Sequence, residues 1–317
     1  MKKLLAVLLL APLTAFAQYP NKPIRWIVPY TGGGITDVVT RIVTQKMSGP
    51  LGQSIVVDNR PGANSILGSD LAAKAAPDGY TMVTVIAGYA ANVTLYQGKL
   101  PFDPKKDLVP VSLAGIAPLI MTATPSLPAK DVNELIAYAK ANPGKLNFGS
   151  SGIGAAAHLT TELFKQTVGV DMVHVPFKGT APALQALMAN DIQVLVDVPS
   201  TLMPHVHGGK IKALAMFSKE RIQGATEVPT MAEAGGPALE SSTWVLFMAP
   251  GGTPKAIVDR LAAETAKAIN ESDIKDRFSQ IGIVPVGNNP AQAQQFLDAE
   301  VAKWAKVINI AGVKAEQ

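Results

Sequence analysis

The chain has 317 residues, no cysteine and a formal net charge of +4, from 28 basic and 24 acidic residues. The missing cysteines exclude disulfides, thiolate metal sites and thiol catalysis, and the near balance of charge, without a Lys/Arg run, excludes the basic footprint of a nucleic-acid-binding protein. The length exceeds what one hydrophobic core comfortably holds and favours two domains.

The first 17 residues have the pattern of a secretory signal peptide. Lys2 and Lys3 precede an apolar stretch from Leu4 to Leu13, and Ala15-Phe16-Ala17 fits a small-x-small cleavage site. The apolar stretch is too short for a full membrane span, which argues against an uncleaved anchor. We therefore expect cleavage after Ala17, export to the periplasm, and a mature chain with 26 basic and 24 acidic residues.

Beyond the signal peptide, short apolar runs alternate with segments of helical periodicity. This alternation predicts an α/β fold with largely parallel sheets. We expect strands at 24–28, 55–57, 81–86, 147–149, 172–175, 194–198, 211–217 and 243–248, and helices at 37–47, 66–75, 132–141, 155–168, 181–189, 254–270 and 290–309.

No long Ser/Gly/Pro linker divides the chain into sequential domains. This favours two lobes joined by crossover strands, an arrangement that suits a hinge. We expect residues 18–120 with 242–317 to form lobe 1 and residues 121–241 to form lobe 2. The hinge candidates are 119–123 and 241–244.

The first glycine-rich loop follows the strand at 24–28 and opens a helix. A helix start carries free backbone N–H groups and about half a positive charge, and glycines let an anion approach that backbone closely. The expected N-cap is Thr36 or Asp37, and Asp37 is given a structural role because its charge competes with an anion. Gly33→Val is expected to block the loop sterically. The candidate ligand contacts are Tyr30, Thr31, Gly32, Gly33, Gly34, Thr36 and Asp37.

The second loop follows the strand at 147–149 and opens another helix. His158 lies one turn into that helix, where it bonds either the loop or the ligand, or pairs with Glu162 four residues on. Neither loop contains Lys or Arg, so capture of an anion would rest on neutral amides, hydroxyls and helix dipoles, with bridging water where reach is short. The loop offers the hydroxyls of Ser150 and Ser151 and the N–H groups of Gly152, Ile153, Gly154 and Ala155.

Further candidates lie at the ends of other predicted strands, where α/β sheets bind ligands. Lys178, with Gly179 and Thr180 after it, is either the nearest cation to the solute or a solvated turn lysine. Asp197 either accepts from an amino or hydroxyl group of the ligand or caps the next helix. The residues Ala87, Gly88 and Tyr89 follow the strand at 81–86 and are expected to line the pocket.

Enzyme classes compete with a binding protein. The segment Gly32-Gly33-Gly34-Ile35-Thr36-Asp37 breaks G-x-G-x-x-G, so neither NAD nor another cofactor is expected. The segment Gly149-Ser150-Ser151-Gly152-Ile153 does not complete G-x-S-x-G, and the four histidines lack a triad context. His205-x-His207 fits a polar helix end better than a metal site. A secreted α/β hydrolytic enzyme acting on a small anionic substrate remains the alternative.

Several motifs, in order along the whole mature chain, resemble the Bug family of extracytoplasmic solute receptors. They are Pro23-Ile24-Arg25, Val28-Pro29-Tyr30 with Gly33-Gly34 and Asp37, Asp58-Asn59-Arg60-Pro61-Gly62-Ala63, Ala76-Pro77-Asp78-Gly79-Tyr80, Leu100-Pro101-Phe102-Asp103-Pro104 with Asp107, Ser151-Gly152 with His158-Leu159, His174-Val175-Pro176-Phe177-Lys178-Gly179 and Gly208-Gly209-Lys210.

The resemblance implies a periplasmic binding protein type II-like fold without enzymatic activity. Its two lobes would close on a small carboxylate-bearing solute and deliver it to the membrane permease subunits of a tripartite tricarboxylate transporter. A monomer is expected, because such a receptor must dock on a permease. Relatives often have Ser or Thr where this chain has Ala155, which leaves the identity of the carboxylate open.

Overall fold

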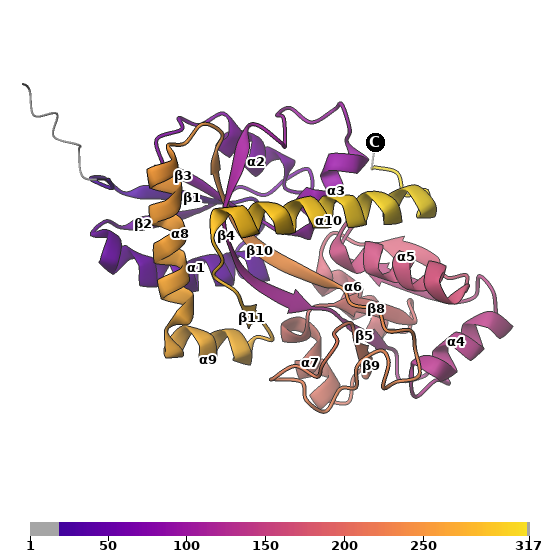
Figure 1. Ribbon diagram of the computed structural model, residues 1–317. Helices are drawn as coiled ribbons and strands as arrows, with labels where there is room; N and C mark the ends of the chain where they lie inside the picture. The colour runs from indigo at the N-terminus through magenta and orange to yellow at the C-terminus, as the bar shows by residue number, and fades with distance from the viewer. Residues whose placement is uncertain (1–18, 316–317) are drawn as a thin grey trace, which may run out of the picture.

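The computed structural model describes residues 19–315, so the expected signal peptide at 1–17 lies outside the described residues. Two separate β-sheets form two lobes, and helices pack around each sheet (Figure 1). We call these the first and the second lobe, after the order in which the chain enters their sheets. The expected α/β, two-lobed fold is confirmed.

The first lobe contains a mixed six-stranded sheet in the order β11-β4-β10-β3-β1-β2. β1 is parallel to β2 and β3, whereas β10 is antiparallel to β3 and β4, and β11 is antiparallel to β4. Three of the five strand pairs in this sheet are antiparallel, so the expectation of largely parallel sheets is wrong for it; two of these pairs arise because β10 returns from the other lobe and enters in the opposite direction. The strands are β1 (Ile24–Val28), β2 (Ile55–Asn59), β3 (Thr81–Val85), β4 (Leu108–Pro118), β10 (Ser242–Pro250) and β11 (Val284–Pro285).

Helices cover both faces of the first sheet, so its central strand β10 is apolar on both sides. Trp244, Leu246 and Met248 pack into one core cluster, while Val245 and Phe247 pack into another, as the two-residue period of a strand requires. The covering helices are α1 (Ile35–Leu51), α2 (Ile66–Ala73), α3 (Ala87–Leu95), α8 (Lys255–Asn270), α9 (Ser272–Gln280) and α10 (Pro290–Ala311).

The second lobe contains a five-stranded sheet in the order β7-β6-β8-β5-β9. β6 is parallel to β7 and β8, and β5 is antiparallel to β8 and β9. The strands are β5 (Ile120–Ala123), β6 (Asn147–Ser150), β7 (Val173–Pro176), β8 (Val194–Asp197) and β9 (Lys212–Met216), with helices α4 (Val132–Ala141), α5 (Ala156–Val168), α6 (Thr180–Met188) and α7 (Pro199–His207). The long helix α10 of the first lobe packs against α5 of the second (Figure 1).

The chain passes between the two sheets twice, and the two passages are hydrogen-bonded to each other. The N–H of Leu119 donates to the carbonyl of Ser241 at 3.1 Å, and the N–H of Phe217 donates to the carbonyl of Leu119 at 2.8 Å. Because β5 already begins at Ile120, the first change of sheet falls at Leu119, one residue before the expected end of lobe 1.

Three helices were not expected from the sequence, and each has a reason. The segment of α3 is mostly small or apolar and shows little helical periodicity, α7 contains Pro199 and Pro204, and α9 follows α8 after Glu271 alone. The uncharged stretch 110–129, which the sequence favours as buried strands with loops, contains most of β4 and all of β5. These elements matter because α3 and α7 begin beside the candidate site.

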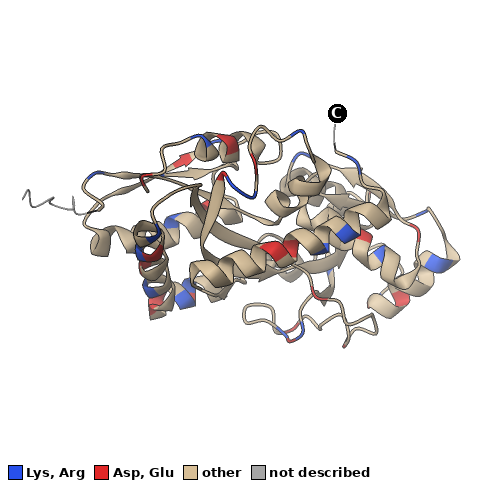
Figure 2. Cartoon of the chain, turned by 45° about the horizontal axis from the view of Figure 1, so that its top comes forward, with Lys and Arg blue, Asp and Glu red and all other residues tan. Residues whose placement is uncertain are grey.

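No helix between residues 19 and 315 has the length and apolar character to cross a membrane. Figure 2 shows basic and acidic residues interspersed on the same helices.

Candidate functional site

A pocket of about 490 Å³ lies between the two lobes, where five helices begin. The starts of α1 and α3 contribute from the first lobe, and those of α5, α6 and α7 contribute from the second. Eleven expected contacts line the pocket: Tyr30, Thr31, Gly34, Thr36, Gly88, Ser151, Ala155, Lys178, Gly179, Thr180 and Asp197. Ten others do not: Gly32, Gly33, Asp37, Ala87, Tyr89, Ser150, Gly152, Ile153, Gly154 and His158.

The helix starts at the pocket leave backbone donors unused. Among the described residues, no side chain caps the N-terminus of α1 or α5. At the start of α1 the N–H groups of Ile35 and Thr36 have no acceptor in residues 19–315, and the same holds for Ala156 and Ala157 at the start of α5. Helix starts carry a partial positive charge, so these two, one from each lobe, can hold an anion between them.

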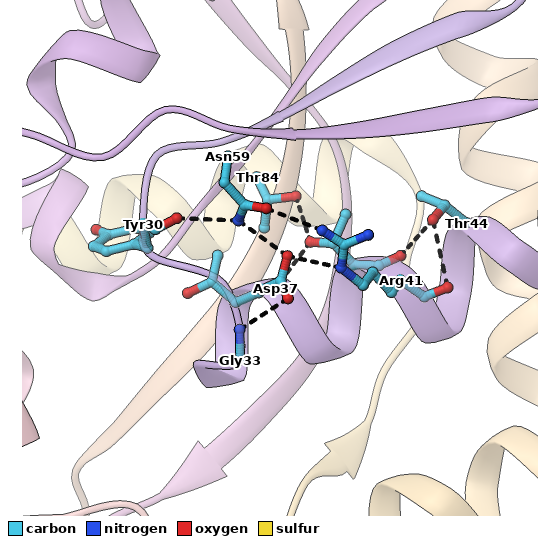
Figure 3. A network of polar contacts seen from close by, with 9 residues as sticks. Tyr30, Gly33, Asp37, Arg41, Thr44, Asn59 and Thr84 are labelled. Atoms are coloured by element: carbon cyan, nitrogen blue, oxygen red, sulfur yellow. Dashed lines mark hydrogen bonds and ion pairs between the residues drawn. The ribbon is translucent and has the colours of Figure 1, made fainter. Parts of the chain in front are cut away.

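The first loop is held in place by a hydrogen-bond network around the carboxylate of Asp37 (Figure 3). Asp37 accepts from the N–H of Gly33 at 3.0 Å, from Arg41 Nε at 2.9 Å and from Asn59 Nδ2 at 3.0 Å, and Asn59 also donates to the carbonyl of Tyr30 at 3.1 Å. Burial opposes ionisation of Asp37, but the three hydrogen bonds outweigh it, so its pKa is lowered. Asp37 therefore has the structural role expected of it.

Two expectations for this loop need correction. The N-cap of α1 is Gly34, not Thr36 or Asp37, and Asp37 bonds backwards to Gly33 from inside the helix. Gly33 has φ +84°, and a Cβ built there would meet no atom within 4 Å, so valine at this position would strain the backbone rather than block the loop.

The second loop uses most of its own donors internally. The N–H of Gly152 donates to Ser150 Oγ at 3.3 Å, that of Gly154 to His158 Nδ1 at 3.1 Å, and that of Ala155 to the carbonyl of Gly152 at 3.2 Å. The expectation that these three groups face the solute is therefore wrong. Instead, the next N–H groups along, in Ala156 and Ala157, are available, and both residues line the pocket.

His158 anchors the second loop as part of an aromatic stack. Its ring lies 3.7 Å from that of His174, and His174 stacks in turn on Phe148 at 4.8 Å. Burial, followed by the nearby His174 and Lys165, lowers the pKa of His158 to about 3, and burial with Lys165 lowers that of His174 to about 4. Both histidines are therefore neutral near pH 7. The expected alternative pairing of His158 with Glu162 is not formed, since Glu162 pairs with Lys165 at 2.9 Å.

Ser150 and His174 form the one contact that suggests hydrolytic chemistry. Ser150 Oγ lies 2.7 Å from His174 Nε2. However, Ser150 is fully buried, lies outside the pocket lining and also bonds the carbonyl of Gly152. Within residues 19–315 no carboxylate orients the other nitrogen of His174, as a catalytic triad requires. The geometry therefore fits a structural bond that shapes the loop.

Two hydroxyl groups of the first lobe are buried at the pocket without a partner in the described residues. They belong to Tyr30 and Thr243, both of which line the pocket. Burial raises the pKa of Tyr30 to about 12 against the opposing influence of the nearby Ser65 hydroxyl, so the Tyr30 hydroxyl stays protonated and can donate. An unpaired buried hydroxyl is unfavourable, and a solute carboxylate would satisfy both groups.

The second lobe contributes the charged residues of the pocket lining, Lys178 and Asp197. Lys178 is exposed and makes no ion pair among the described residues. Asp197 accepts from Thr180 Oγ1 at 2.7 Å and from the N–H of Val198 at 2.8 Å, next to the start of α7. Burial raises the pKa of Asp197, although both hydrogen bonds oppose this.

Of the three residues Ala87, Gly88 and Tyr89 after β3, one lines the pocket and two are buried in the core. Gly88 lines the pocket, and a Cβ there would lie 3.5 Å from the hydroxyl of Tyr30. Ala87 is buried, and Tyr89 is buried with its hydroxyl donating to the carbonyl of Pro104 at 3.1 Å. The expectation that all three line the pocket is wrong for the last two, because α3 begins at Ala87 and turns them into the core.

Sequence reasoning missed several pocket residues, of which Asn64, Thr201 and Thr243 are polar. Asn64 exchanges hydrogen bonds with Asn92 at 2.9 and 2.7 Å, and it lies in a run of three residues with positive φ, from Ala63 to Ser65. Thr243 comes from β10, far along the chain. The family motif Asp58-Asn59-Arg60-Pro61-Gly62-Ala63 ends next to Asn64 and is the sequence signal that could have indicated it.

The described residues contain no group of three or more His, Asp or Glu side chains arranged to hold a metal ion. His207 of the His205-x-His207 pair contacts Glu227 at 2.6 Å. A second cavity, of about 570 Å³, lies behind the crossover near Pro118 and is lined by the 218–223 segment and α9. None of the five helix starts lines this second cavity, so the pocket between the lobes is the candidate site.

Comparisons with known proteins identify a matching family, similar sequences and similar structures. Residues 39–313 match the family model described as "Tripartite tricarboxylate transporter family receptor". The protein BugT of Bordetella pertussis is 36% identical over 306 residues, which cover 96% of this chain and 93% of BugT.

Solved structures with similar folds include two carboxylate complexes. The structure of R. palustris Rpa4515 with adipate is 35% identical, has a TM-score of 0.86, and is matched over 93% of this chain and 99% of that one. MatC from Rhodopseudomonas palustris with bound malate is 34% identical, has a TM-score of 0.80, and is matched over 92% of this chain and 100% of that one. The resemblance to Bug proteins and the binding-protein fold are confirmed.

Proposed function

Because this chain belongs to the tripartite tricarboxylate transporter receptor family, we propose that it captures a small carboxylate-bearing solute between its lobes and delivers it to the membrane permease subunits of such a transporter. The family is one of periplasmic solute receptors rather than enzymes. Export through the signal peptide at 1–17 would bring this chain to the same compartment, and it would act there as a monomer without a cofactor.

The observation that carries the proposal is that unused hydrogen-bond donors from both lobes lie at the same pocket. The N–H groups of α1 and α5 come from opposite lobes, and the buried hydroxyls of Tyr30 and Thr243 lie with them without partners in residues 19–315. A carboxylate supplies acceptors to all of these groups. The bound adipate and malate of the two similar structures support the same class of solute.

Capture would involve closure about the paired crossovers. In this proposal residues 18–120 with 242–317 move against residues 121–241, and the hinge lies at Leu119 and Ser241, where the passages are hydrogen-bonded. Because the pocket is lined from both lobes, closure shields the solute from water and strengthens each hydrogen bond to it.

Isothermal titration of the mature protein with mono-, di- and tricarboxylates tests the proposal. We expect saturable binding of at least one carboxylate. Tyr30→Phe should weaken it about tenfold, because a hydrogen bond to a charged group is worth about 1.5 kcal/mol or more. Tyr89→Phe is the matched control, since that hydroxyl donates to Pro104 outside the pocket, and it should bind as the unchanged protein does. Absence of heat with every carboxylate would refute the proposed function.

A further inference from the structure

The pocket contains a carboxylate of its own, although it is built to hold an anionic solute. Asp197 ends β8 and has only 8% of its surface exposed, and its neighbour in sequence, Val198, also lines the pocket. Among the residues that line the pocket, Asp197 is the one acidic side chain and Lys178 the one basic side chain. These two side chains make no ion pair with each other in the described chain.

Asp197 is held in a fixed orientation and retains acceptor capacity. Thr180 Oγ1 donates to Oδ2 at 2.7 Å, and the N–H of Val198 donates to Oδ1 at 2.8 Å. An ionised carboxylate has about four lone-pair sites, so roughly half remain unused. The hydroxyl proton of Thr180 is directed to Asp197, and it is therefore not available to a solute carboxylate.

Asp197 is thus a local acceptor on the second lobe, set apart from the donors at the start of α5 and at Lys178, whereas the first-lobe wall offers donors. On the first lobe, Tyr30 and Thr243 offer unpaired hydroxyls, and Ile35 and Thr36 offer free N–H groups. A solute carboxylate placed against Asp197 would be repelled and would leave its remaining lone-pair sites unpaired. A hydroxyl or ammonium group placed there would pair with it.

We propose that Asp197 is a specificity-determining residue that selects carboxylates bearing a hydroxyl or ammonium group near one carboxylate, over plain dicarboxylates of the same length. The shared chemistry is a hydrogen-bond donor next to an anionic group. This inference rests on the proposed function, because it assigns the solute's carboxylates to the helix starts and its donor to Asp197.

Titration with matched solutes tests this inference. Each set contains a plain dicarboxylate and its 2-hydroxy and 2-amino derivatives, for chains of four, five and six carbons. We expect the best hydroxy or amino member to bind at least tenfold more tightly than its plain parent, and the two derivatives identify which donor is used. In Asp197→Asn, which keeps the volume but removes the charge, the preference should fall to about threefold or less.

Lys178→Met is the control, because it removes a pocket charge that is not proposed to contact the hydroxyl or ammonium group of the solute. It should weaken the binding of all members of a set by a similar factor. Two results would overturn the inference while leaving the proposed function intact: plain parents that bind the unchanged protein as tightly as their derivatives, or a preference that survives in Asp197→Asn. The first comparison needs no variant, so it decides even where Asp197→Asn fails to fold. Failure of every carboxylate to bind would instead refute both.

Discussion

The stacked histidines of the second loop should make the protein lose stability in mild acid. His158 accepts a hydrogen bond from the N–H of Gly154 through Nδ1, and its ring lies 3.7 Å from that of His174. A proton on Nδ1 would break that hydrogen bond, and charges on both rings would repel each other in a buried site. The neutral forms are therefore favoured in the folded state.

The size of the effect follows from the pKa values. Folding lowers the pKa of His158 from 6.5 to about 3 and that of His174 from 6.5 to about 4. Below about pH 6.5 the unfolded chain binds more protons than the folded one, so the free energy of unfolding falls as the pH falls toward the folded values. One pKa unit corresponds to about 1.36 kcal/mol. At about pH 5 each histidine should therefore lower stability by about 2 kcal/mol, or about 4 kcal/mol for the pair.

Urea unfolding at about pH 7.5 and about pH 5 measures this loss. The double variant His158→Asn and His174→Gln keeps a polar atom near Nδ1 of the first ring and near Nε2 of the second, but it cannot titrate. Its loss of stability between the two pH values should be smaller than that of the unchanged protein by about 4 kcal/mol. His205→Gln, outside the stack, should keep the full loss. Equal losses in the unchanged protein and the double variant would refute the reasoning.

Three further substitutions test individual parts of the account. Gly33→Val should lower the free energy of unfolding by about 1–2 kcal/mol, because φ is +84° at this position. It should change solute affinity less than threefold, because the Cβ points into open space. A large loss of affinity in titration would contradict the placement of Gly33. Glu300→Leu should lower the free energy of unfolding, measured in urea, by about 2–4 kcal/mol. The reason is that Glu300 Oε2 accepts from the buried indoles of Trp244 at 2.8 Å and Trp304 at 2.9 Å. Glu300→Gln keeps an acceptor and should lower the free energy of unfolding by less. Asp131→Ala removes the N-cap bond to α4 and should cost about 1 kcal/mol without altering solute binding, and unchanged unfolding would argue against the cap.

The two loops could be predicted from the sequence because their signals are local. A short apolar strand, glycines and a helix start lie within about a dozen residues of each other, so both helix starts follow from adjacent residues, although the N-cap of α1 was expected at Thr36 or Asp37 and lies at Gly34. The same local reasoning could not tell which N–H groups face the pocket. Gly33 and Gly154 donate to side chains one turn into the next helix, Asp37 and His158, and that depends on how each loop folds back.

The remaining pocket residues depend on contacts between distant segments. Thr243 reaches the pocket because β10 inserts between β3 and β4, and no property of residues 242–250 specifies that position. The roles of Tyr89 and Ala87 were misjudged because α3 shows little helical periodicity, so its start at Ala87 was not expected. The partner of Ser150 was also hidden, since His174 lies on the neighbouring strand β7.

A crystal structure of the mature protein with its preferred carboxylate would test the central claim most directly. The account predicts that carboxylate oxygens lie within hydrogen-bond distance of free N–H groups at the starts of α1 and α5, with the hydroxyls of Tyr30 and Thr243 completing the contacts. A solute bound elsewhere, for example in the cavity beside α9, or one held in the pocket by Lys178 alone with both helix starts uncontacted, would contradict it.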